Sequence, residues 1–260
     1  MFTINSNFKS IAEVLVYLKN NNITNINERA IFIQDFIDKE NLGDGNAHEL
    51  YLENGSSTLM NVINEHSGMK KECILWCVNH YLSLNRNINV IEKTCKALYQ
   101  FGTGCGTSAP SCGMSSLHKE IEKRVAKLVG KEEAVLFPTG FTANLGSISF
   151  LPSHLDLIIF DRDCHSSILN GIRLSKAKSI PFKHNNVADL EKKLQRYEKS
   201  FENIFVVLES AYSMSGDLSP LIEITDLKKS YSFYLYVDEA HSFGIYGEKG
   251  QGYCYEQGVS

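Results

Sequence analysis

The stretch 234-YLYVDEAHSFG-244 indicates the fold class of this chain. It begins with a short run, 234–237, that is apolar throughout, and a polar turn follows directly. Three earlier runs have the same form, at 134–137, 157–160 and 204–208. Short runs that are continuously apolar, without alternation, are typical of strands whose two faces are both buried.

Helical patterns separate these runs. In the segment 187–198, Leu190, Leu194 and Tyr197 lie on one helical face. A second helix is expected to begin with Ser219 as its N-cap and Pro220 as its first residue. Strands that alternate with helices predict an α/β domain with a mostly parallel sheet flanked by helices.

Further helices are expected before this domain. Val90, Ile91, Cys95 and Leu98 recur at helical spacing, and a glycine-rich loop follows at 102–114. Ser115 is the predicted N-cap of the next helix, and Gly130 is its predicted C-cap. The apolar face of that helix is expected to consist of Leu117, Ile121, Val125 and Leu128.

The first part of the chain is polar and rich in asparagine. Two helices are predicted there, from the spacing of Ile11, Leu15 and Leu18 and of Ile33, Phe36 and Ile37. The sequence GDGN at 43–46 is typical of a turn. We therefore expect a helical N-terminal segment of unknown role at 1–65, a second segment at 66–100 and a large domain at 101–260.

Composition excludes several classes of protein. The 260 residues are 43% hydrophobic and 22% charged, with a net charge of −4 and no cluster of basic residues of the kind that binds nucleic acid. No apolar stretch is long enough for a membrane span, and the N-terminus does not resemble a signal peptide, so a cytoplasmic location is expected. The seven cysteines include no CxxC pair, so no metal site is predicted.

The residues that follow each predicted strand are the candidates for chemistry, because ligands of open α/β sheets bind beyond the carboxyl ends of the strands. Asp238 ends an apolar strand, where a carboxylate is unfavourable unless a cation or a strong donor pairs with it. A protonated pyridine nitrogen is such a partner, and His241 could reach the same ligand. The DEAH box of helicases shares these letters, but it requires a phosphate-binding loop GxxxxGK[ST] that this sequence lacks.

The other strand ends carry weaker signals. After 134–137, Thr139 and the amides of Gly140 and Phe141 could form a phosphate cradle at a helix start, although a simple turn has the same form. His165 after 157–160 could lie over an aromatic ring or could be ordinary polar surface. Glu209 and Ser213 follow 204–208, where turn residues are also common.

Eight stretches, taken in order, resemble the α-oxoamine synthases, a branch of the fold-type-I enzymes that use pyridoxal 5'-phosphate (PLP). The resemblance covers about 72–260 and rests on 79-NHYLSL-84, 102-GTGCGTS-108, 117-LHKEIE-122, 139-TGFTANLG-146, 161-DRDCHSSILNGIRLS-175, 184-HNNVADLEKKL-194, 209-ESAYSMSGDLSPL-221 and 237-VDEAHSFGIYGEKGQG-252. Such a resemblance implies the large domain of a PLP-dependent transferase.

The resemblance also implies a role for each candidate. Asp238 would pair with the pyridinium nitrogen, His165 would stack on the ring, and these two with His241 would be the catalytic residues. The remaining roles are phosphate binding by Thr139, Gly140 and Phe141, hydrogen bonding near the ring O3′ by Ser213 and His241, support by Glu209, and contact with substrate near the entrance by Asn79 and Tyr81.

The family chemistry is a decarboxylative condensation of an amino acid with an acyl-thioester, usually acyl-CoA, in a homodimer. Two departures stand out. Ser108 follows Thr107 where family members often carry an arginine. The family's cofactor-binding lysine lies about thirty residues past the DEAH-like motif, whereas this chain ends nineteen residues past His241.

Three explanations are open for this missing end. The chain is a fragment, a split protein completed by a second chain, or a PLP-binding remnant without activity. The alternative functions are therefore a catalytically inactive subunit of a heteromer and an aminotransferase of the same fold.

Overall fold

The computed structural model describes residues 8, 10–40, 50–65 and 67–259. The chain divides into two compact units, Met1–Glu92 and Lys93–Ser260. Each unit has its own buried apolar clusters, one in the first unit and two in the second.

The two helices predicted near the N-terminus are confirmed. They are α1 (Ile11–Asn20) and α2 (Ile26–Glu40), and they pack around a shared apolar cluster. Its buried members are Val14, Leu18, Phe32 and Phe36. The predicted turn at 43–46 lies outside the described residues.

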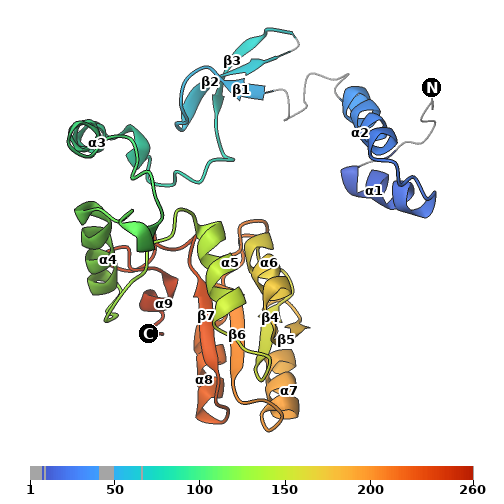
Figure 1. Cartoon of the computed structure of the whole chain (residues 1–260), viewed down its shortest axis with the longest axis vertical. Helices are drawn as coiled ribbons and strands as arrows, with labels where there is room; N and C mark the ends of the chain where they lie inside the picture. The colour runs from blue at the N-terminus through green and yellow to red at the C-terminus, as the bar shows by residue number, and fades with distance from the viewer. Residues whose placement is uncertain (1–7, 9, 41–49, 66, 260) are drawn as a thin grey trace. The chain divides into compact units, whose positions relative to one another are not determined.

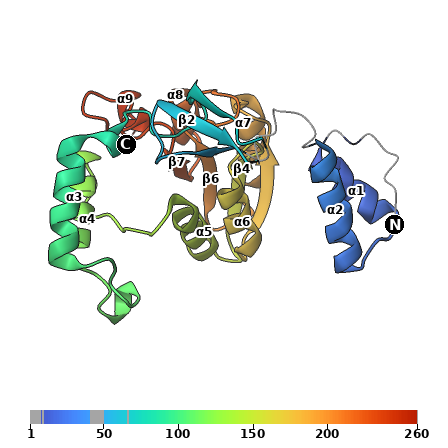
Figure 2. The ribbon, with the colours of Figure 1, turned by 90° about the horizontal axis from the view of Figure 1, so that it is seen from above.

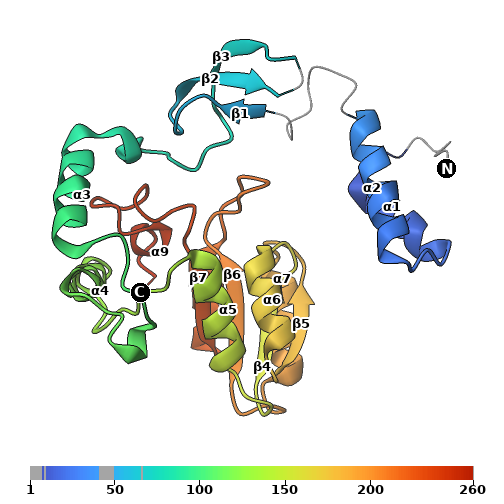
Figure 3. The ribbon, with the colours of Figure 1, turned by 45° about the horizontal axis from the view of Figure 1, so that its top comes forward.

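A small antiparallel sheet follows, which the sequence did not predict. Its strands are β1 (Leu50–Leu52), β2 (Leu59–Asn64) and β3 (Lys70–Ile74), with β2 in the middle (Figure 3). These strands are short and mostly half-buried or exposed, so they lack the clean alternation of apolar and polar residues that identifies a strand. The expected division at residue 65 falls in the connection between β2 and β3.

The second unit confirms the predicted α/β fold with a parallel sheet. Its four strands run in the order β5-β4-β6-β7 (Figure 1). Their bounds are β4 (Leu157–Asp161), β5 (Lys178–Phe182), β6 (Ile204–Glu209) and β7 (Tyr234–Asp238). All three pairings in this sheet are parallel, so the carboxyl ends of the strands lie at one edge.

Helices cover both faces of this sheet. Figures 1 and 2 show α5 (Gly140–Phe150) and α6 (Ser166–Leu174) on one face, and α7 (Val187–Tyr197) and α8 (Leu221–Asp226) on the other. Alternate residues of a strand therefore enter different cores. Ile158 of β4 packs in the cluster that contains residues of α5 and α6.

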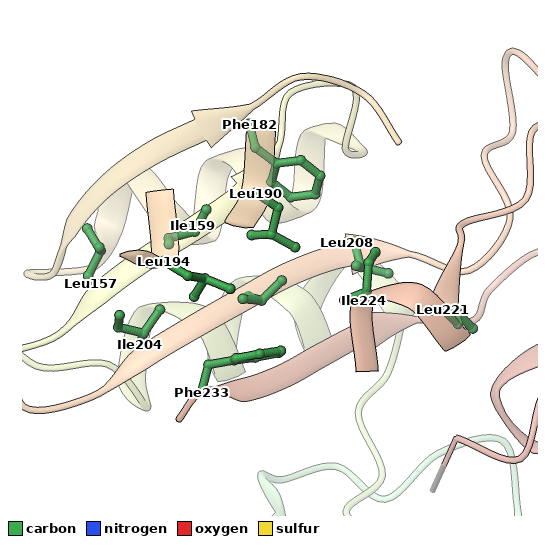
Figure 4. Close-up of a cluster of buried hydrophobic side chains, with 11 residues drawn as sticks. Leu157, Ile159, Phe182, Leu190, Leu194, Ile204, Leu208, Leu221, Ile224 and Phe233 are labelled. Atoms are coloured by element: carbon green, nitrogen blue, oxygen red, sulfur yellow. The ribbon is translucent and has the colours of Figure 1, made fainter. Parts of the chain in front are cut away.

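The larger core lies between the sheet and the helices α7 and α8 (Figure 4). Leu190 and Leu194 of α7 are fully buried against Leu157 and Ile159 of β4. Full burial of such side chains stabilises the fold by roughly 1.5–3 kcal/mol each. This core explains why the 187–198 pattern predicted α7 correctly.

The remaining helices are α3 (Ile88–Phe101), α4 (Ser116–Leu128) and α9 (Tyr253–Glu256). The predicted N-cap of α4 is confirmed, with Ser115 in a capping box, whereas the C-cap is Val129. Gly130, which was predicted as the C-cap, comes one residue later with φ +69°. However, Leu117 and Ile121 of its predicted apolar face are exposed.

Three local predictions were wrong. The run 134–137 is not a strand; among the described residues no strand pairs with it, and Val135 is 75% exposed. Strand β5 was missed because KSIPF contains a lysine and a proline, which suit an edge strand and hide the apolar signal. Helix α8 begins at Leu221 with Pro220 as its cap, since the Ser219 hydroxyl instead donates to the Glu209 carbonyl at 2.7 Å.

Within the described residues, no helix has both the length and the apolar character needed to cross a membrane.

Candidate active site

Acidic residues end three neighbouring strands of the parallel sheet. Asp161 ends β4, Glu209 ends β6 and Asp238 ends β7. Glu209 lies beside Asp238 in the pairing of β6 with β7. The sheet therefore gathers carboxyl groups at the edge where the sequence predicted a site.

Asp238 is half-buried and accepts two hydrogen bonds from its own chain. The Asn144 side-chain amide donates to Oδ2 at 2.7 Å, and the Ala240 backbone N–H donates to Oδ1 at 2.9 Å. The prediction that this carboxylate pairs with a cation or a strong donor is met in part by these two donors of the chain itself. Each oxygen keeps a further lone pair that can accept from a ligand.

Asn144 is the centre of this arrangement. It lies on α5, is 6% exposed, and its Nδ2 also donates to Ser167 Oγ at 2.9 Å. Its Oδ1 accepts from the Tyr236 hydroxyl at 2.8 Å, and burial raises the pKa of Tyr236. Asn144 thereby fixes the Asp238 carboxylate relative to α5, α6 and β7.

No role was predicted from the sequence for Asn144, Ser167 or Tyr236. Asn144 lies within the quoted stretch 139-TGFTANLG-146, and Ser167 lies in the stretch that contains His165. A polar residue on the inward face of a helix was the available signal for Asn144, since buried polar groups are usually hydrogen-bonded for a structural reason.

His165 is the N-cap of α6 and is joined to the same network. Its backbone N–H donates to the Glu209 carboxylate, and its Nδ1 lies 2.7 Å from Ser167 Oγ. The Ser167 backbone N–H also donates to Nδ1, at 3.3 Å. Because Nδ1 acts as an acceptor, the neutral ring carries its proton on Nε2.

The His165 ring lies near the start of α5. Its centroid is 6.4 Å from that of Phe141, with the rings at 85° to each other. The side chain is exposed, so the ring is accessible to a ligand.

Glu209 is the last residue of β6, and its side chain is buried, with 4% exposed. Burial raises its pKa to about 7, and repulsion from Asp238 and Asp161 acts in the same direction. The N–H of His165 opposes the shift by stabilising the ionised form. The Glu209 carboxyl therefore binds the backbone at the start of α6 and can hold a proton near neutral pH.

The N-terminus of α5, where the sequence predicted a phosphate cradle, lies near the His165 ring. Thr139 caps the helix, with its Oγ1 accepting from the Thr142 N–H at 3.1 Å. The N–H groups of Gly140 and Phe141 have no partner within the helix, because they belong to its first turn. Nothing lies within 4 Å of the point where a Cβ on Gly140 would stand, so the chain is not crowded on that side of Gly140.

The other predicted site residues do not belong to the hydrogen-bond network around Asn144. Ser213 is exposed in the turn after β6, and His241 is half-buried in the turn after β7. Asn79 and Tyr81 belong to the first unit, where both are exposed. Their predicted contacts with cofactor and substrate stay predictions.

Comparison with known families decides the relationship. A family model described as aminotransferase class I and II matches residues 71–255. The chain belongs to this family. This match covers the whole parallel sheet and all the residues of the network around Asn144.

Within this family, the chain is similar to enzymes of the α-oxoamine synthase branch. The chain is 41% identical over 189 residues to a serine palmitoyltransferase of Bacteroides ovatus, which covers 73% of this chain and 48% of the relative. It is 38% identical over 178 residues to 8-amino-7-oxononanoate synthase 2 of Bacillus subtilis, covering 68% of this chain and 46% of the relative. Both are α-oxoamine synthases, which confirms the resemblance drawn from the motifs.

Solved structures agree with this assignment. The serine palmitoyltransferase of Sphingomonas wittichii superposes with a TM-score of 0.80 at 35% identity, over 87% of this chain and 55% of that one. A serine palmitoyltransferase of S. paucimobilis, solved with a bound PLP–myriocin aldimine, gives a TM-score of 0.78 at 33% identity over the same shares. This chain spans about half the length of the curated relatives that it matches.

Proposed function

We propose that this chain forms the PLP-binding part of an acyltransferase that condenses an amino acid with an acyl-CoA thioester, with loss of CO2. The observation that carries the proposal is the hydrogen-bonded chain from Asp238 through Asn144 and Ser167 to His165, next to the N-terminus of α5. Family membership and the α-oxoamine synthase relatives support it.

The residues present fit the cofactor. A carboxylate held by two donors suits a pyridinium nitrogen, an exposed imidazole suits the ring face, and a helix N-terminus that is not crowded at Gly140 suits a phosphate. When bound, PLP acts as an electron sink for a carbanion next to its amine-bearing carbon. The chain's part is to hold and polarise that ring.

Each residue contributes a distinct step. Asp238 would keep the ring nitrogen of bound PLP protonated, and Asn144 restrains rotation of the carboxylate. Ser167 favours the neutral tautomer of His165 that carries its proton on Nε2, because Nδ1 is occupied. The amides of Gly140 and Phe141 would bind the phosphate with the favourable end of the α5 dipole.

The activity is proposed for a complete catalytic unit. In the family, a lysine outside the part that this chain spans holds the cofactor covalently, so the activity is proposed only for a unit that contains such a lysine. A homodimer is the expected assembly. Ser108, where relatives often have arginine, leaves the recognition of the substrate carboxylate to another residue.

The proposal is tested by assaying the complete catalytic unit with candidate substrates. This unit is expressed either from the gene with its downstream codons or together with a full-length homologue encoded beside it. Serine, alanine and glycine are each incubated with short- and long-chain acyl-CoA, and release of CoA thiol and CO2 is measured. We expect one donor and acyl chain to give both products together.

Two other results would contradict the acyltransferase proposal. Amino transfer to an oxo acid without release of CoA would replace the acyltransferase proposal with an aminotransferase. Absence of any turnover by a preparation that binds PLP would favour the inactive subunit.

A further inference from the structure

The buried carboxylate of Asp161 lies outside the network around Asn144. It ends β4, is fully buried, and accepts three hydrogen bonds. The backbone N–H groups of Asp163 and Asn185 donate at 2.9 Å each, and His184 Nδ1 lies 3.0 Å away. Burial of a carboxyl group this deep in the fold is unfavourable without such hydrogen-bond partners.

His184 connects this carboxylate to another loop. Its Nε2 lies 3.2 Å from Oδ2 of Asp217, in the loop between β6 and α8. The ring also packs edge-on against Tyr212, with centroids 4.5 Å apart and planes at 89°. Asp161 and Asp217 therefore lie on the two nitrogens of one imidazole.

The same loop carries Ser213. An isolated antiparallel β-bridge pairs Ala211 with Leu218 at the base of this loop. The Tyr212 N–H donates to the Asp217 carbonyl at 2.9 Å. The neighbouring Asn185 side chain donates to the Leu218 carbonyl at 3.2 Å. Ser213 thus lies at the tip of a loop whose base is anchored through residues 184 and 185.

The number of protons on His184 decides whether both contacts can form. A neutral imidazole has one N–H, so it can donate to only one carboxylate and presents a lone pair to the other. The imidazolium donates to both. Burial by itself would lower the pKa of His184, but hydrogen bonding to Asp161, with further attraction from Asp217 and Asp163, raises it instead.

Other charged groups around the ring act in the same sense. Asp163 Oδ2 lies 3.8 Å from Nδ1 and is itself paired with Arg162, and the charge of Glu209 also interacts with His184. The surroundings of the ring are therefore predominantly acidic.

We propose that protonated His184 is a positioning residue that clamps the 211–218 loop, and with it Ser213, to the Asp161 carboxylate. A raised pKa means that the clamp is complete below the ordinary histidine value of 6.5 and is lost as pH rises through the folded value. The clamp is a property of the chain alone. Its consequence for Ser213 and the cofactor rests on the proposed function.

The test follows the exchange of loop amides by NMR. Tyr212 and Gly216 are suitable probes because both donate backbone hydrogen bonds within the loop. Their protection factors, corrected for intrinsic exchange, are measured at about pH 6 and about pH 9. We expect a fall of roughly tenfold in the wild type, since hydrogen bonds to charged groups are among the stronger ones.

Three variants distinguish protection that depends on the His184 clamp from general effects of pH on amide exchange. His184→Gln should give low protection at both pH values. Asp217→Asn should give high protection at both, because its amide can donate to the neutral ring nitrogen. His154→Gln, at an exposed histidine near the opposite end of β4, should match the wild type.

Protection that is independent of pH in the wild type would overturn the proposal, as would a pH-dependent fall that survives in His184→Gln. Low protection in Asp217→Asn at both values would also contradict it. In parallel, each variant is titrated with 4-deoxypyridoxine 5′-phosphate, a PLP analogue without the aldehyde. If this probe binds to none of them while the loop shows the expected pattern, the proposed function fails and the clamp stands.

Discussion

Asp238 and Glu209 are neighbours across two strands, yet the chain treats their carboxyl groups differently. Asp238 is half-buried and has donors at 2.7 and 2.9 Å, whereas Glu209 is almost fully buried and accepts the single N–H of His165. This difference in burial and hydrogen bonding gives the two carboxyl groups different roles. Asp238 is held by two donors, whereas burial raises the pKa of Glu209 to about 7.

The raised pKa of Glu209 predicts a pH-dependent stability. Between its ordinary value of 4.5 and about 7, the folded chain holds a proton that the unfolded chain has lost. By linkage, the free energy of unfolding falls as pH rises through this window. Glu209→Gln keeps an acceptor for the His165 N–H and removes the charge, so it should be more stable than the wild type by about 2 kcal/mol at about pH 8.

Urea unfolding between about pH 4.5 and about pH 8 measures this difference. Glu202→Gln, at an exposed glutamate just before β6, serves as the matched control and should follow the wild type. An equal pH slope in Glu209→Gln and the wild type would show that Glu209 titrates normally.

At the scale of elements, the sequence predicted those that carry a strong local signal. The strands β4 and β6 and the helix α7 were found because their apolar patterns coincide with buried positions. Strand β7 was found from its apolar run, although it is only half-buried. The edge strand β5 and the exposed strands β1, β2 and β3 were not, because the tertiary pairing that forms them leaves little trace in composition.

The candidate site shows the same limit. Asp238 and His165 lie at or just after the ends of strands, so a rule about strand ends found them. The start of α5 was predicted from the run 134–137, which is not a strand. Asn144, Ser167 and Tyr236 act through contacts between elements up to 94 residues apart in the chain, as between Asn144 and Asp238. A local pattern does not reveal such pairings.

Helix α5 positions Asn144 and the predicted phosphate cradle, so its cap should matter. Thr139→Ala removes the acceptor of the Thr142 N–H and should lower the free energy of unfolding by about 1 kcal/mol. Thr139→Ser keeps the hydroxyl and should restore most of the loss. Chemical denaturation of the three proteins checks this; equal stability of the alanine and serine variants would mean that the cap contributes nothing.

On the scale of the whole molecule, one side of the parallel sheet stands out. Among the described residues, β7 pairs only with β6, and a cavity of about 410 Å³ lies along it. Apolar side chains of Leu235, Val237, Tyr255 and Val259 contribute to its lining. Open strand edges with apolar surroundings are prone to pair with another chain.

We therefore expect this chain, on its own, to self-associate through β7 in a concentration-dependent way. Tyr234 is 60% exposed on this strand, and its ring stacks on Phe205 at 5.3 Å. Tyr234→Lys should shift the chain toward monomer, whereas Tyr234→Phe keeps the stacking and should not. Sedimentation velocity over a range of concentrations checks this, and a wild type that is monomeric throughout would contradict it.

We propose that the edge of the sheet around Asp238 holds the ring and phosphate of PLP. Calorimetric titration with 4-deoxypyridoxine 5′-phosphate measures this binding alone, because the analogue cannot react with surface lysines. We expect saturable binding at one site per chain, weakened at least about tenfold by Asp238→Ala, with Asp226→Ala on the exposed side of α8 unchanged. Absence of binding, or equal affinity of the Asp238→Ala variant and the wild type, would contradict it.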